Sequence, residues 1–150
     1  MVPEESLTHR SLASALFNRT WELLDKETRS HEEKAEMLTA AFASRYHWRK
    51  AGEPLNFAIS DWQVSRVAAI LGYADLAEEY GWRSLEVASR SSLGPFYECY
   101  AHEALARAAR LAGDRDLKKK HLDIAYEALG RVEKADERDL LSADLDELRG

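Results

Sequence analysis

Thiols and long apolar runs are scarce in this 150-residue sequence. The single cysteine, Cys99, cannot form an internal disulfide, and it cannot supply the several thiolates of a structural zinc or iron–sulfur site. No apolar run approaches the roughly 18 residues that span a bilayer. The N-terminal segment MVPEESLTHR lacks the basic start and apolar core of a signal peptide. We therefore expect a cytoplasmic protein without a membrane partner.

Glycine and proline are also few, with seven and three residues respectively. Nearly all of them fall between segments in which apolar residues recur with the 3.6-residue period of a helix. Runs that alternate polar and β-branched residues, the pattern of a strand, are absent, whereas strong helix formers such as Ala, Leu, Glu and Lys dominate. These features predict an all-α protein.

Positive charge is in deficit, because 27 acidic residues stand against 21 basic ones and the net charge is -6. Such a chain repels a phosphate backbone unless its basic residues gather on one face, so nucleic-acid binding is disfavoured. The hydrophobic fraction of 45% and the length fit one folded domain that covers residues 1–150.

The apolar periodicity divides the chain into about seven helices. We expect three helical hairpins and a C-terminal capping helix, at about residues 7–52, 54–90, 95–130 and 136–149. Ser30 and Glu33 have the spacing of a capping box at a helix start. Pro54 and Pro95 suit the first turn of a helix, where a missing N–H is harmless. Gly81 lies inside a predicted helix, where it would let a neighbouring helix approach closely.

Several apolar side chains are expected to pack between helices. Four leucines of the last helix are predicted to share one side and to cover the final hairpin: Leu140, Leu141, Leu145 and Leu148. Three tryptophans are predicted as packing residues: Trp21, Trp48 and Trp82. Cys99 is predicted to be a small buried residue rather than a nucleophile.

The second and third hairpins align with each other as an internal repeat. The offset is 41 residues, the separation of Gly72 and Gly113, and it also places Leu76 on Leu117. On six of its residues, the third hairpin resembles a tetratricopeptide repeat: Leu105, Ala106, Ala109, Gly113, Leu122 and Ala125. The resemblance covers about residues 54–130, and the chain is also similar to uncharacterised bacterial proteins of the same build. It implies a right-handed superhelix of antiparallel hairpins that binds a protein segment or peptide along its concave face.

In such a superhelix the first helix of each hairpin lines the concave face. The repeat register therefore assigns six residues to a binding groove: Trp62, Arg66, Tyr100, Glu103, Arg107 and Arg110. We expect Trp62 and Tyr100 to offer flat apolar surface and the arginines to grip a carboxylate of the partner. Alternatively, Glu103 and Arg107 form an ordinary i,i+4 surface pair worth about 0.3 kcal/mol and the aromatic residues belong to the core. The groove interpretation predicts a non-enzymatic interaction module that needs no cofactor.

A rival hypothesis assigns the function to a polar cluster. Its members would be His47, Asn56, Asp61, Glu98 and His102, with Tyr46 and Tyr97 nearby. A histidine of this set could act as general base in a small-molecule-binding or hydrolytic protein. Glu98 and His102 are four residues apart and could share a metal, but the sequence has no HExxH motif or thiolate cluster, so we expect no metal. A third hypothesis is self-association into a homo-oligomer through exposed helix faces.

Overall fold

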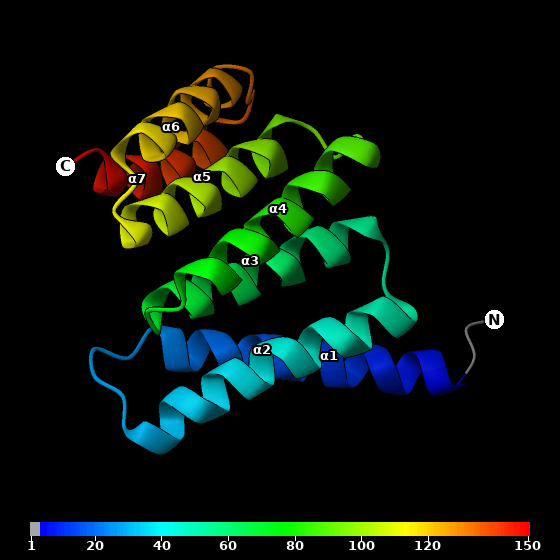
Figure 1. Ribbon diagram of the computed structural model, residues 1–150. Helices are drawn as coiled ribbons and strands as arrows, with labels where there is room; N and C mark the ends of the chain where they lie inside the picture. The colour runs from blue at the N-terminus through cyan, green and yellow to red at the C-terminus, as the bar shows by residue number, and fades with distance from the viewer. Residues whose placement is uncertain (1–3) are drawn as a thin grey trace.

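Residues 4–150 form seven helices and no strand in the computed structural model, which describes side chains from residue 8 onward (Figure 1). The helices are α1 (Glu4–Leu24), α2 (His31–Ala51), α3 (Pro54–Ile70), α4 (Ala74–Arg90), α5 (Pro95–Ala112), α6 (Arg115–Leu129) and α7 (Ala135–Arg149). The predicted all-α class and helix count are confirmed for this range. Residues 1–3 of the predicted domain lie outside it. None of the described helices has both the length and the apolar character needed to cross a membrane.

The helices begin and end at the residues whose local chemistry predicts it. Ser30 accepts a hydrogen bond from the Glu33 N–H, and the Glu33 carboxylate accepts one from the Ser30 N–H, which completes the predicted capping box of α2. Pro54 and Pro95 lie at the starts of α3 and α5. Gly113, with φ of 78°, ends α5 in the left-handed conformation that glycine adopts without strain.

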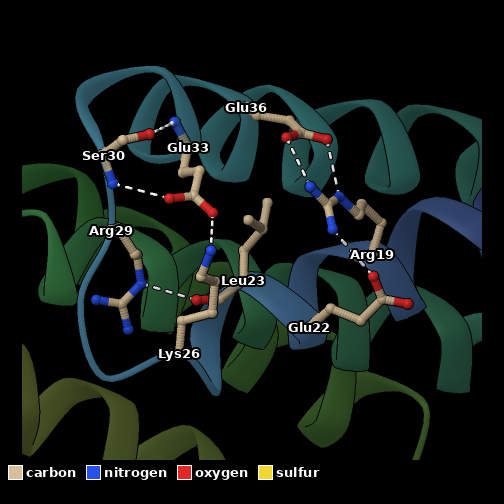
Figure 2. Close-up of polar contacts among 8 residues, drawn as sticks. All are labelled: Arg19, Glu22, Leu23, Lys26, Arg29, Ser30, Glu33 and Glu36. Atoms are coloured by element: carbon tan, nitrogen blue, oxygen red, sulfur yellow. Dashed lines mark hydrogen bonds and ion pairs between the residues drawn. The ribbon is translucent and has the colours of Figure 1, made fainter.

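The turn between α1 and α2 is fixed by two arginines (Figure 2). Arg29 donates from Nε to the carbonyl of Leu23 at 2.8 Å and from Nη2 to the carbonyl of Leu24 at 2.9 Å. These bonds satisfy carbonyls that the end of α1 leaves without a helical partner. One turn earlier, Arg19 forms a two-pronged ion pair with Glu36 of α2, with both N–O distances at 2.9 Å. The first two helices are therefore held as a hairpin.

Three hairpins, α1/α2, α3/α4 and α5/α6, stack in chain order, and α7 lies against the last of them (Figure 1). The odd-numbered helices run in one direction and the even-numbered helices run in the other. Neighbouring hairpins pack through α2 on α3 and through α4 on α5. At the second of these interfaces Gly81 is buried, and a Cβ atom there would lie 3.0 Å from Cδ2 of Leu105. The close approach expected at this glycine is confirmed.

The last helix covers one side of the α5/α6 hairpin with three of its four leucines. Leu141, Leu145 and Leu148 are fully buried in a cluster with residues of α5 and α6. Leu140 is 55% exposed, so the prediction that all four leucines share the core side is wrong. The 100° step between successive helical residues turns Leu140 away from the seam. Trp82 of α4, predicted to pack between helices, contacts the ring of His121 of α6 at 5.6 Å but remains 48% exposed.

Candidate functional site

A pocket of about 460 Å³ lies between the odd-numbered helices, and we call it the aromatic pocket. It is lined by Phe17, Trp21, Ala58, Ile59, Trp62, Arg66, Ser84, Phe96, Tyr97, Tyr100, Leu140 and Asp144. Ser84 is the one lining residue from an even-numbered helix. The volume falls in the range of about 300–1,000 Å³ that is usual for ligand pockets. Five helices, α1, α3, α4, α5 and α7, thus contribute to one cavity.

Helical spacing brings the aromatic side chains of this pocket together. Phe96 and Tyr100 are four residues apart on α5 and therefore share a face. The ring of Trp62 lies 5.3 Å from that of Tyr100 at 70°, and 5.8 Å from that of Trp21 at 30°. Phe96 in turn lies 5.2 Å from Tyr100 at 80°. Edge-to-face and tilted contacts of this kind are favourable, so the rings hold one another in place and form one wall of the pocket.

Polar groups in the aromatic pocket are few. The Tyr100 hydroxyl donates to Oδ2 of Asp144 at 3.0 Å. Burial, followed by the nearby Asp144 charge, raises the pKa of Tyr100, so the phenol keeps its proton and remains a donor. Nε1 of Trp62 is shielded from solvent and has no acceptor among the residues that the structure describes. A buried donor of this kind costs about 1–3 kcal/mol.

A second depression, of about 320 Å³, adjoins the first, and we call it the arginine pocket. Its lining consists of Arg66, Ala69, Ile70, Arg107, Arg110, Leu111 and Glu147. Arg66 lines both pockets, so the two cavities share a wall. Five of the six residues that the repeat register assigned to a groove therefore line one of two adjoining pockets.

The sixth, Glu103, lies beneath the arginines and is fully buried. Its Oε1 atom accepts hydrogen bonds from Arg107 and, at 3.5 Å, from Arg66. Burial raises the pKa of Glu103, and the charges of Arg107 and Arg66 act against that rise. The alternative of an ordinary surface pair is wrong, because Arg107 is only 8% exposed. Since Arg107 and Arg66 both pair with Glu103, Arg110 is the arginine better placed to meet a partner.

The members of the rival polar cluster have separate partners. Asp61 is fully buried, and its carboxylate accepts from Arg45 at 2.5 Å and from Arg49 at 2.9 Å. Asn56 accepts from the Glu53 N–H at the start of α3. These two side chains thus hold α2 against α3 and cap a helix.

The histidines and Glu98 of that cluster are equally dispersed. Nδ1 of His47 lies 2.8 Å from Nδ1 of His9, and Nδ1 of His102 lies 3.1 Å from Nδ1 of His121. Glu98 forms an ion pair with Arg131 at 3.3 Å. Of the two tyrosines, Tyr46 packs beside His47, and Tyr97 lines the aromatic pocket. The fold does not gather the set into one site.

Metal-ligating and nucleophilic groups are also separated. Among the residues with described side chains, no three His, Cys, Asp or Glu residues lie close enough to hold one metal ion. Cys99 is buried, as predicted, and its thiol donates to the carbonyl of Ala125 at 3.3 Å. Burial raises the pKa of Cys99 to about 12, which disfavours the reactive thiolate.

Sequence reasoning missed part of the aromatic pocket. Phe17 and Trp21 carry a usable signal, because an aromatic pair at i,i+4 on an otherwise polar stretch forms an apolar face. Asp144 carries no such signal. Its place in the pocket depends on how α7 docks, which periodicity does not determine.

Comparison of the chain with protein-family models, with curated proteins and with solved structures found no match. The likeness to tetratricopeptide repeats therefore rests on the internal pattern of this sequence. The stacked hairpins of the fold are compatible with a helical-repeat protein.

Proposed function

We propose that this chain is a cytoplasmic, non-enzymatic helical-repeat module that binds a segment of a partner protein on the face formed by its odd-numbered helices. The proposed shape is a right-handed, tetratricopeptide-like superhelix, with α1, α3, α5 and α7 on the inner side. One observation carries the proposal: the aromatic pocket and the arginine pocket adjoin on this face and draw nearly all their lining from those helices.

In this proposal the two pockets divide the recognition. Apolar side chains of the partner enter the aromatic pocket beside Trp62 and Tyr100, where the loss of apolar surface from water supplies most of the affinity. A partner carboxylate meets Arg110 at the arginine pocket through charge-assisted N–H bonds. The wall of packed rings limits rearrangement on binding.

The rival polar cluster is less well supported as a functional site. The Asp61 carboxylate accepts hydrogen bonds from two arginines, and the Asn56 side chain caps a helix. Within the described part of the chain, neither side chain is paired with a histidine. A general base must lie within hydrogen-bond reach of its substrate and have a group to orient it. Hence we place the function in the two pockets.

The test begins with a random peptide library displayed on phage and selected on the immobilised wild-type protein. Selected peptides are then titrated calorimetrically against two matched variants. Leu140→Ala removes most of an exposed apolar side chain from the aromatic pocket, whereas Ile124→Ala removes a similar side chain from α6 outside both pockets. We expect Leu140→Ala to weaken binding about fivefold and Ile124→Ala to leave it unchanged. Equal affinity for all three proteins contradicts the proposal.

A second pair of variants tests the arginine pocket. Arg110→Glu reverses a charge in that pocket, and Arg115→Glu reverses one on the same hairpin outside both pockets. For selected peptides that contain an acidic residue, Arg110→Glu should reduce the affinity and make it less dependent on salt, whereas Arg115→Glu should change neither the affinity nor its salt dependence. If the two variants behave alike, the carboxylate contact is wrong.

A further inference from the structure

Asp144 differs from the other acidic residues of the interior in having no cationic partner. Asp61 forms ion pairs with Arg45 at 2.5 Å and with Arg49 at 2.9 Å. Glu103 forms ion pairs with Arg107 and, at 3.5 Å, with Arg66. Asp144 receives one hydrogen bond, from the Tyr100 hydroxyl, and none of the residues with described side chains forms an ion pair with it. Its carboxylate lines the aromatic pocket. The pocket therefore contains an anion whose charge this chain leaves uncompensated.

The aromatic faces of the pocket are also free of cations. Elsewhere in the chain, cations lie over aromatic rings: Arg49 is 4.6 Å from the ring centre of Phe57, and Arg45 is 5.2 Å from that of Tyr80. Among the described side chains, no such cation covers Trp21, Trp62 or Tyr100. The negative face of an aromatic ring attracts a cation within about 6 Å, and tryptophan does so best. A carboxylate among such rings is suited to a positively charged group.

Arg66 lines the same pocket and would oppose a cation if its charge were free. It is paired with Glu103, which lies one turn beyond Tyr100 on α5. Arg66 and Arg107 both form their ion pairs with Glu103, and neither forms one with Asp144. The net charge of -6 also attracts a basic partner over longer distances.

We infer that the aromatic pocket receives a lysine or arginine side chain of the partner segment, with its charged head against the Asp144 carboxylate and its alkyl stem along the rings of Trp62 and Tyr100. The inference rests on the proposed function and specifies the partner's chemistry. The volume of about 460 Å³ accepts an apolar neighbour of the basic residue as well. The preferred segment is therefore basic and apolar where it enters this pocket, and acidic where it reaches the arginine pocket.

Two small compounds test the charge directly, because they differ in the ammonium group alone. N-acetyl-lysine methylamide and N-acetyl-norleucine methylamide are titrated into 15N-labelled protein, and the indole N–H signals of Trp21 and Trp62 are followed. The lysine compound should shift both signals and bind about tenfold more tightly than the norleucine compound, which corresponds to the 1.4 kcal/mol of one cation contact. Trp48 and Trp82, which do not line the pocket, are internal controls.

Asp144→Asn should abolish the preference for lysine. Asp146→Asn is the matched control, because Asp146 lies on the same helix and also accepts a hydrogen bond from a tyrosine hydroxyl, that of Tyr126, but outside the aromatic pocket. The preference should survive in that variant. Equal binding of the two compounds to wild type overturns the inference without requiring any variant to fold, as does an absence of shifts with both.

The two proposals fail in distinguishable ways. If the norleucine compound binds the pocket as well as the lysine compound does, basic recognition is wrong, but a segment-binding pocket is retained. If selected peptides bind with no effect of Leu140→Ala, the proposed function itself is wrong.

Discussion

A Cβ atom on Gly81 of α4 would lie 3.0 Å from Cδ2 and 3.2 Å from Cγ of Leu105 of α5. Contacts this short between carbon atoms are repulsive, so the absence of a side chain at position 81 sets how closely the second and third hairpins pack. Because this interface fixes α3 relative to α5, it also sets the width of the aromatic pocket.

Gly81→Val should therefore destabilise the protein. The added methyl groups would overpack a filled interface, and we expect the free energy of unfolding to fall by about 1–3 kcal/mol. Glu78→Val introduces the same residue at an exposed position of the same helix and shows what a valine costs in α4 without overpacking. Urea denaturation monitored by circular dichroism measures the free energy of unfolding of both variants. A variant Gly81→Val as stable as Glu78→Val would show that the hairpins are not tightly packed here.

Asp61 should act as a structural anchor between α2 and α3. Replacing it with asparagine removes the charge that compensates Arg45 and Arg49 while keeping the size of the side chain. Loss of hydrogen bonds to a charged group predicts a stability decrease of about 1.5–3 kcal/mol. Asp123→Asn, which breaks the exposed pair with Lys119, should cost less than about 0.5 kcal/mol. Equal costs in thermal or urea unfolding would contradict the anchoring role.

Local signals in the sequence were sufficient for the helices. Ser30, Glu33, Pro54, Pro95 and Gly113 all lie where capping and turn chemistry predict. These features depend on residues a few positions apart, which a single sequence contains in full. Predicted boundaries differ from the observed ones by a few residues at helix ends, where hydrogen bonding is weakest.

Contacts between residues of different helices could not be predicted, because the local pattern of a single sequence does not contain them. The i,i+4 spacing of Glu103 and Arg107 is the same on a surface and in a core, and the burial of the pair follows only from how the neighbouring helices pack against α5. His102 and Asp61 read as a possible shared site, yet their partners His121 and Arg45 come from other helices. A repeat register carries three-dimensional information along the chain, and five of the six residues that it assigned to a groove line adjoining pockets; that they bind a partner stays a prediction.

Glu103 and Arg107 should show strong energetic coupling in a double-mutant cycle. Glu103→Gln leaves the buried guanidinium of Arg107 without its counter-charge, and Arg107→Met leaves the carboxylate without its closest partner, so each single change should cost about 3–5 kcal/mol. The double variant should cost less than the sum of the two. Additive losses would mean that the two side chains do not stabilise each other.

The imidazole pair of His102 and His121 should make stability fall in mild acid. Burial, and then the neighbouring His121, lowers the pKa of His102 to about 4, against 6.5 for an ordinary histidine. The unfolded chain therefore takes up a proton below pH 6.5 that the folded chain accepts only near pH 4, and the free energy of unfolding declines as the pH falls between these values.

Melting temperatures of the wild type and of His102→Gln between pH 7.5 and 4.5 measure this effect. Between pH 7.5 and 4.5 the melting temperature of the wild type should fall further than that of His102→Gln. His31→Gln, a change at an exposed histidine outside both imidazole pairs, should follow the wild type. Parallel curves for wild type and His102→Gln would contradict the lowered pKa.

The central claim is that a partner segment binds between the odd-numbered helices, and the four tryptophans test it most directly. Trp21 and Trp62 line the aromatic pocket, whereas Trp48 and Trp82 lie outside both pockets. The measurement is a 15N NMR titration of the four indole N–H signals with a peptide selected on the wild-type protein. Binding between the odd-numbered helices should shift the Trp21 and Trp62 signals saturably and leave those of Trp48 and Trp82 unmoved. Shifts confined to Trp48 or Trp82 would place the binding surface elsewhere and contradict it.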